Sequence, residues 1–304
     1  MRSLKVGISR TAFARGASGR LRDDPWFFAK EAERLGFDSL WSGEHVVVPR
    51  TDENAHSYHS EGVPAMPSSI VRLAGVAAAT TKLRIGTAIL ILPEHNPINL
   101  AKQLATLDAD SNGRLSVGVG VGWNRQEMEV MGGHFDRRVA QTMDAVSVLK
   151  KLWSGEFVAH SGEFYQFPAI MCQPRPAQRP HPPLLFGMNT ENAFARIVAH
   201  ADGWLPSVYK PDEIRGAGID RVARGREHLD KLCEQAGRDP RSVEITAIIA
   251  DAPEDPLDRA LLQRYADAGA DRVSLLQSRE ANMVFASDAA ASAWLERVAE
   301  RTLG

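Results

Sequence analysis

The stretch "RLSVGVGVGWNRQEMEVMG" (114–132) decides the fold, because it joins a strand pattern to a helix-like pattern through a glycine-rich turn. The dinucleotide-binding fingerprint G-x-G-x-x-G makes the same kind of junction, but its third glycine is missing here in both registers. Counting from Gly118, that position is Trp123, and counting from Gly120 it is Arg125. The stretch also lacks the Gly-Lys-Ser/Thr ending of a phosphate-binding P-loop. The spacing therefore does not fit a Rossmann fold.

Strand patterns followed by helix patterns recur along the whole chain, which predicts parallel strands joined by crossover helices. The expected strands are residues 5–9, 38–41, 83–89, 114–120, 183–187, 202–206, 243–249 and 271–276. Eight such units within 304 residues, with no linker to a second domain, predict one α/β domain over 1–304. We expect the strands to close into a (β/α)8 TIM barrel, and an open doubly wound sheet is the rival architecture.

The region 155–182 interrupts this alternation of strand and helix patterns. Its first part, "GEFVAHSGEFYQF" (155–167), has the pattern of a hairpin, and "CQPRPAQRPHPP" (172–183) has too many prolines for regular structure. We interpret 155–182 as a proline-rich insertion before the fifth strand, and we expect it to lie over the mouth of the barrel.

Composition excludes several classes of protein. The chain has 36 basic and 38 acidic residues and a net charge of −2, which gives no electrostatic basis for binding nucleic acid. No apolar run approaches the roughly 18 residues of a membrane span, and the first residues have a strand pattern unlike that of a signal peptide. We therefore expect a soluble, cytoplasmic protein that binds neither membranes nor nucleic acid.

No metal site is expected. Cys172 and Cys233 are far apart and have neither metal-ligand spacing nor a disulfide framework. The polar loop 53–61 contains two histidines and two glutamates, but no zinc signature surrounds them. This loop is expected to close over a substrate or to be mobile.

Active groups of such barrels lie at the carboxyl ends of the strands. The second strand runs into "WSGEHVVVP" (41–49), which places Glu44 and His45 just past its end. Histidine gives or takes a proton near neutral pH, or donates a hydrogen bond to a reduced cofactor. We expect His45 and Glu44 to be catalytic, with Glu44 orienting the imidazole. The alternatives are a structural histidine bonded to a loop backbone and a glutamate that caps the following turn.

Two further features mark the predicted mouth. Glycines at alternate positions of 118–122 leave one face of the strand end without side chains, which permits close approach of a ligand or of a neighbouring backbone. After the fifth strand, Asn189 or Thr190 caps a helix in "GMNTENAFARIVAH" (187–200), and a helix start at the mouth suits phosphate. Arg175, Arg179 and His181 are either additional positive charge for that phosphate or parts of a solvated loop.

Five segments together resemble the bacterial luciferase-like monooxygenase family, especially its class dependent on the deazaflavin coenzyme F420. They are "GFDSLWSGEHVVVP" (36–49), "KLRIGTAILILPEHNPINLAKQLATLD" (82–108), "GRLSVGVGVGWNRQEMEVMG" (113–132), "FPAIMCQPRPAQRPHPPLLFGMN" (167–189) and "ADGWLPS" (201–207). The resemblance implies a TIM-type barrel, commonly a homodimer, whose flavin or deazaflavin lies over the strand ends.

The resemblance also implies roles for individual residues. His45 matches the histidine that lies against the reacting ring in deazaflavin members. Ala88-Ile89 matches a bulge where a non-prolyl cis peptide backs the ring, and Val121 and Gly122 match backbone positions that contact it. The full set of expected cofactor-binding residues is Trp41, Thr87, Ala88, Ile89, Val121, Gly122, Trp123, Gly187, Met188, Asn189 and Thr190.

Two positions depart from the family pattern. Trp123 stands where the sugar-phosphate dehydrogenase branch has a catalytic glutamate, so the acid of that branch is missing. The fifth strand ends in Gly187-Met188, whereas the family often has paired glycines there.

Three functions follow from the resemblance. The first is an F420-dependent oxidoreductase that moves hydride between the deazaflavin and a small organic substrate. The second is an FMN-dependent monooxygenase that uses reduced flavin and O2. The third is a catalytically silent flavin-binding protein. In the first, Trp41, Trp123 and Phe186 wall the ring or substrate, or else belong to the barrel core.

Overall fold

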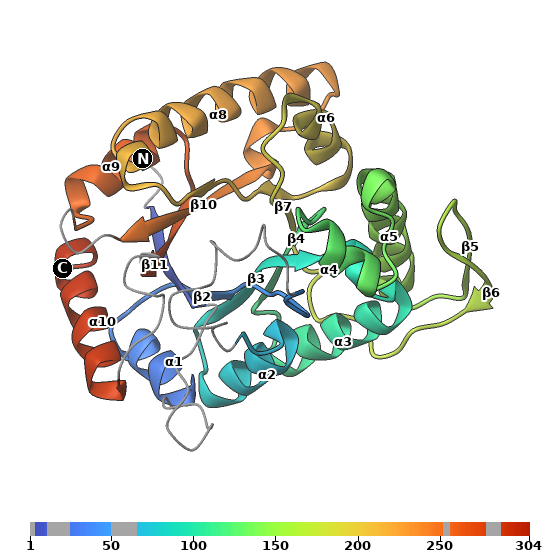
Figure 1. Ribbon diagram of the computed structural model, residues 1–304, viewed down its shortest axis with the longest axis horizontal. Coiled ribbons are helices and arrows are strands. Elements are labelled where there is room, and N and C mark those ends of the chain that lie inside the picture. Colours follow the sequence, from blue (N-terminus) through green and yellow to red (C-terminus); the bar gives the residue numbers. More distant parts are fainter. Residues whose placement is uncertain (1–3, 11–24, 50–65, 252–255, 278–286) are drawn as a thin grey trace.

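Parallel strands close into a barrel in the computed structural model of the chain, which describes residues 4–10, 25–49, 66–251, 256–277 and 287–304 (Figure 1). The barrel strands are β1 (Lys5–Ser9), β2 (Ser39–Ser42), β3 (Arg84–Ile91), β4 (Leu115–Gly120), β7 (Leu184–Phe186), β8 (Gly203–Trp204), β10 (Glu244–Asp251) and β11 (Arg272–Gln277). They are ordered β11-β1-β2-β3-β4-β7-β8-β10, and β10 pairs with β11 to close the ring. The prediction of a (β/α)8 barrel is confirmed, and an open sheet is excluded. The predicted loop 53–61 lies outside the described residues.

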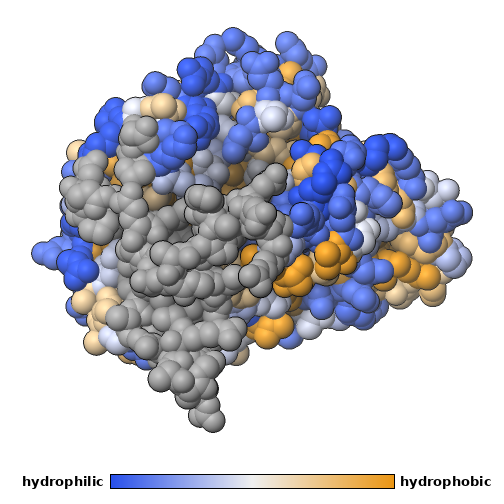
Figure 2. Space-filling view, in the orientation of Figure 1, coloured by the Kyte–Doolittle hydropathy of each residue, from blue (hydrophilic) through white to orange (hydrophobic). Residues whose placement is uncertain are grey.

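Helices surround this barrel (Figure 1). They are α1 (Pro25–Arg34), α2 (Ser69–Ala79), α3 (Pro97–Asp110), α4 (Arg125–Val130), α5 (Arg138–Trp153), α6 (Glu191–His200), α7 (Pro211–Ile214), α8 (Ala217–Gln235), α9 (Arg259–Asp267) and α10 (Asp288–Thr302), with short 3-10 turns η1 (Leu92–Glu94), η2 (Phe135–Arg137) and η3 (Pro240–Ser242). The space-filling view shows predominantly hydrophilic residues over α8 and α5 on this face (Figure 2). This outer polarity is expected of helices that turn an apolar side to a central sheet.

Local sequence explains where α3 begins. The side-chain oxygen of Asn96 accepts hydrogen bonds from the backbone N–H groups of Ile98 and Asn99, and Pro97 occupies the first helical position. Leu100, Leu104 and their neighbours on the same face are buried against the barrel. The helix start and the apolar stripe predicted from the sequence are both present.

The inside of the barrel is packed in layers. Trp41 is 1% exposed and clusters with Leu185, Leu205, Ile248 and Leu276, while its indole N–H donates to Ser39 at 2.9 Å. Nearer the amino-terminal ends of the strands, the layers become polar.

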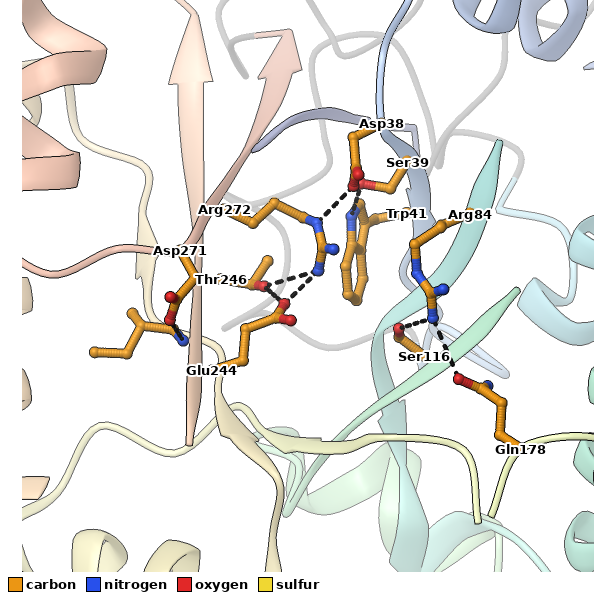
Figure 3. Close-up of polar contacts among 11 residues, drawn as sticks. Asp38, Ser39, Trp41, Arg84, Ser116, Gln178, Glu244, Thr246, Asp271 and Arg272 are labelled. Atoms are coloured by element: carbon orange, nitrogen blue, oxygen red, sulfur yellow. Dashed lines mark hydrogen bonds and ion pairs between the residues drawn. The ribbon is translucent and has the colours of Figure 1, made fainter. Parts of the chain in front are cut away.

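Arg272, which is 2% exposed, lies at this amino-terminal end (Figure 3). Its guanidinium bonds Asp38 at 2.7 Å and also bonds Glu244. Beside it, Arg84 reaches Ser116 and Gln178. The charge of Arg272 is thereby paired inside the fold, which a buried charge requires.

The predicted hairpin is confirmed as the antiparallel pair β5 (Val158–Ser161) and β6 (Gln166–Ile170), which projects beyond α5 (Figure 1). It is fastened to α5 through Asp144, whose carboxylate lies 2.7 Å from His160 Nε2. The same carboxylate accepts the backbone N–H groups of Phe164 and Tyr165. The hairpin therefore packs against the side of the barrel.

The proline-rich part of the insertion lies at the amino-terminal end of the barrel, so the prediction that it covers the mouth is wrong. Gln178 bonds the carboxylate of Asp108 through both its backbone N–H and its side-chain amide. The same amide donates to the carbonyl of Leu115, where β4 begins. The physical reason is topological. A connection from a helix to the next parallel strand must deliver the chain to the start of that strand, and this start lies opposite the mouth.

Candidate active site

A bulge in β3 shapes the mouth. The pairing of β3 with β4 shifts register between Thr87 and Leu90, and the intervening Ala88-Ile89 peptide bond is cis, as the family resemblance predicts. The hydroxyl of Thr87 donates to the carbonyl of Gly118 at 2.8 Å, which ties the bulge to β4.

The glycine run of β4 makes room for this bulge. A Cβ on Gly118 would lie 2.1 Å from the carbonyl oxygen of Thr87, and one on Gly120 would lie 2.6 Å from Ile89 Cδ1. A Cβ on Gly187 would approach the same isoleucine, at 2.9 Å from its Cγ2. The side-chain-free face is thus filled by a neighbouring strand, which was the packing alternative left open by the sequence. Ring contact with the backbone of Val121 and Gly122 stays a prediction.

His45 is held at the mouth by a carboxylate from a different element. Its Nδ1 lies 2.6 Å from Oε2 of Glu127, whose side chain is fully buried in the first turn of α4. The imidazole is 16% exposed, and Trp123 stands edge-on to it with ring centroids 5.8 Å apart. Asn124 caps α4 by accepting the backbone N–H of Glu127, so the position of the carboxylate is set by the helix start.

Glu44 does not orient His45, and that prediction is wrong. Its Oε1 lies 2.6 Å from Nε2 of His95 and accepts the backbone N–H of Ile91 at 3.2 Å. The loop after β2 turns these two adjacent side chains toward different partners. The mouth therefore contains two histidine–glutamate pairs, His45–Glu127 and His95–Glu44.

Sequence reasoning missed Glu127, His95 and Glu94. All three lie inside the segments that carry the family resemblance, close to strand ends, which is the signal that points to them. Glu94 is 4% exposed, and neither of its carboxylate oxygens has a hydrogen-bond partner among the described residues. Burial raises the pKa of the Glu94 carboxyl to about 8, and the carboxylates of Glu127 and Glu44 add to the rise.

The other predicted site residues divide by burial. Ala88, Ile89, Val121 and Gly187 are half-buried at the strand ends, and Trp123 is 57% exposed. Ala88 and Ile89 form the bulge of β3, and all five residues remain candidates for cofactor contact.

Trp41, Thr87 and Phe186 are fully buried in the barrel core. Met188 is also buried, and its carbonyl accepts the indole N–H of Trp204. The burial of Trp41 and Phe186 fits the core alternative, and contact of Trp41, Thr87 or Met188 with a cofactor stays a prediction.

The start of α6 keeps its backbone donors uncapped by a side chain. Thr190 occupies the N-cap position without a capping hydrogen bond, and Asn189 is exposed beside it. Arg175, Arg179 and His181 belong to the insertion and therefore lie toward the other end of the barrel. Arg179, for example, donates to the carbonyl of Gln178. They do not supply charge for a phosphate at this helix start.

Within the described ranges, no three histidine, cysteine, aspartate or glutamate side chains converge as metal ligands. No helix in the same ranges combines the length and the hydrophobicity of a transmembrane span.

Similarity to known proteins agrees with this geometry. A Mycobacterium tuberculosis protein without a characterised function is 32% identical over 254 residues, covering 81% of this chain and 84% of that protein. The oxygenase component of a flavin-dependent trigonelline monooxygenase from Acinetobacter baylyi is 31% identical over 243 residues, covering 78% of this chain and 61% of that protein. An F420-dependent secondary alcohol dehydrogenase, solved with an F420–acetone adduct, has the same fold, with a TM-score of 0.72, 19% identity and coverage of 97% and 98%.

The model of the luciferase-like monooxygenase family matches residues 25–302. The chain therefore belongs to the luciferase-like monooxygenase family and is an oxidoreductase of that family.

Proposed function

We propose that the chain is an F420-dependent oxidoreductase that transfers hydride between the deazaflavin and a small organic substrate. The observation that carries this proposal is the 2.6 Å contact between His45 Nδ1 and the buried carboxylate of Glu127. A histidine fixed in this way suits proton exchange beside a hydride carrier, because its orientation is set by a partner that solvent does not reach.

The residues at the mouth fit a flat ring system. Ala88, Ile89, Val121 and Gly187 are half-buried and uncharged, which matches the apolar face of a tricyclic ring. The uncapped start of α6 offers backbone N–H groups to a phosphate in the cofactor tail. When bound, the deazaflavin supplies the hydride chemistry.

The chain's own residues then have distinct tasks. Glu127 holds Nδ1 of His45, so the proton that His45 exchanges is the one on Nε2. The indole of Trp123 packs edge-on against the imidazole and limits its rotation. The bulge at Ala88-Ile89 supports the ring from the barrel side.

A binding titration tests the choice of cofactor. The purified chain is titrated with coenzyme F420 and, separately, with FMN, each in oxidised and reduced form. We expect micromolar affinity for the deazaflavin and much weaker binding of FMN. Micromolar affinity for FMN together with no binding of F420 would overturn the proposal.

That opposite result would favour the second candidate, an FMN-dependent monooxygenase that uses reduced flavin and O2. The 31% identity to the trigonelline oxygenase component supports this candidate. Binding of either cofactor with no turnover of any substrate, in a panel of small alcohols, ketones and N-heterocycles, would favour a silent flavin-binding protein.

We also propose that the chain acts as a homodimer, as is common in the family. Light scattering coupled to size exclusion checks this directly. A mass near the 33.3 kDa of a single chain would contradict it.

A further inference from the structure

A third carboxyl group, that of Glu94, lies near enough to the two histidine–glutamate pairs of the mouth to feel the charges of Glu127 and Glu44. Glu127 and Glu44 each bond one imidazole at 2.6 Å. The third, Glu94, ends the turn η1 directly before His95, and the imidazole of His95 is directed to Glu44. Among the described residues, the carboxyl oxygens of Glu94 therefore have no partner like the imidazole that each of the other two carboxylates contacts.

Within the part of the chain that the structure describes, no element packed against Glu94 supplies such a partner. From the loop after β2 come Glu44 and His45, which belong to the pairs, and α4 contributes Glu127. Helix α5 also packs against η1, and it begins with the cation of Arg138. That guanidinium donates to the carbonyl of Phe135 and lies 4.1 Å over the phenyl ring of the same residue.

Burial then decides the protonation state of Glu94. At 4% exposure and with both oxygens unpartnered among the described residues, an ionised Glu94 would be an uncompensated buried charge beside two further carboxylates. The neutral acid avoids both desolvation and repulsion. The raised pKa of Glu94, about 8, agrees with this independent argument.

We propose that Glu94 is a neutral carboxylic acid at neutral pH and that the loss of its proton adjusts the proton affinity of both histidine–glutamate pairs. The proton leaves to solvent and a negative charge stays behind, so the step needs no co-reactant. Electrostatic coupling is reciprocal: because the carboxylates of Glu127 and Glu44 oppose ionisation of Glu94, an ionised Glu94 acts in turn on the two carboxylates that hold His45 and His95. Glu94 is a positioning residue in this scheme.

The catalytic consequence rests on the proposed function, but the proton balance is measured without cofactor. Imidazole resonances of isotopically labelled histidines are followed by NMR from pH 5 to pH 10 in the wild type and in Glu94→Gln. Substitution of His45 or His95 assigns the two signals. The matched control is Glu129→Gln, which changes an exposed glutamate on the neighbouring helix α4.

We expect the His45 and His95 signals of the wild type and of Glu129→Gln to show an extra inflection near pH 8, and Glu94→Gln to lose it. An inflection that persists in Glu94→Gln, or a wild type without one, would overturn the inference. Infrared spectroscopy adds a readout that needs no variant. The carbonyl stretch of a protonated carboxylic acid in the wild type is expected to vanish as the pH rises through about 8.

The pH dependence of enzyme turnover is the last measurement. If the proposed function holds, kcat/KM of the wild type changes through the same pH interval, and Glu94→Gln loses this change while Glu129→Gln keeps it. Failure of F420 to bind, together with an intact NMR inflection, rejects the proposed function and leaves the inference on Glu94 standing.

Discussion

At the scale of single residues, the chemistry of the mouth depends on which carboxylate each histidine meets. His45 meets Glu127, which is 82 positions away in the chain, and His95 meets Glu44, which is 51 positions away. Because both glutamates are almost fully buried, each pair keeps its geometry without help from a bound ligand. Substitutions at these residues are therefore expected to affect proton transfer more than cofactor binding.

His45→Ala is expected to lower kcat by about 100-fold, the usual contribution of a positioned acid or base, and to change the Kd of the cofactor only a few-fold. Stopped-flow turnover and a cofactor titration measure the two quantities separately. His200→Ala, at the exposed end of α6, is the matched control. Equal losses of affinity and turnover would place His45 in binding and not in proton transfer.

Glu94 makes stability depend on pH in a definite direction. Its carboxyl ionises near 4.5 in the unfolded chain and near 8 in the folded one, so the folded state binds the extra proton between these values. Stability therefore falls as the pH rises from about 4.5 to about 8, by a few kcal/mol in total.

Glu94→Gln is expected to remove this fall and to be more stable than the wild type at pH 9. Urea unfolding at pH 5, 7 and 9 measures the difference, with Glu129→Gln as the control. Parallel stability curves for the wild type and Glu94→Gln would show that Glu94 ionises freely in the folded state.

At the scale of elements, the mouth is built from the fit of β3 into β4. The glycines of β4 are required because the displaced chain at Thr87 and Ile89 occupies the space of their side chains. The two close contacts differ in kind. Gly118 faces a backbone oxygen, which cannot move alone, whereas Gly120 faces the end of an isoleucine side chain.

Gly120→Ala is therefore expected to cost about 1–3 kcal/mol, the range typical of overpacking, because Ile89 can adopt another rotamer. Gly118→Ala should cost more, since the strand itself must shift. Urea unfolding of both variants ranks them. A Gly118→Ala protein as stable as Gly120→Ala would mean that the bulge adapts more easily than its contacts indicate.

At the scale of the whole molecule, the two ends of the barrel have different tasks. The carboxyl end holds the histidine–glutamate pairs, and the amino end holds the buried Arg272 layer with the insertion tied beneath β3 and β4 (Figure 3). Stability and chemistry are therefore separable by substitution.

Arg272→Met is expected to destabilise the fold by about 3 kcal/mol, because it leaves two carboxylates unpaired, and to leave cofactor affinity unchanged. Asp38 and Glu244 retain some solvent contact, which keeps the cost at the low end for a broken buried pair. Thermal unfolding and the cofactor titration check both statements. Arg224→Met, on the exposed face of α8, serves as the control. A large loss of affinity would show that the two ends are coupled.

The fold was largely predictable because its signals are local. Buried parallel strands such as 114–120 are nearly continuous apolar runs, and Asn96-Pro97 marks a helix start by its own chemistry. The site was predictable only in part. His45 follows a strand end and was found, but its partner Glu127 comes from a distant helix, and local spacing pointed to Glu44 instead. The insertion was misplaced because composition identifies a loop without saying which end of the barrel it joins.

The guanidinium of Arg272 lies 5.7 Å from the ring of Trp41, within reach of a cation–π contact, and together these side chains plug the axis of the barrel. Substrate and product are therefore expected to enter and leave through the same end of the barrel. Product must leave this end before the next substrate molecule binds, so we expect the product to inhibit competitively with respect to substrate.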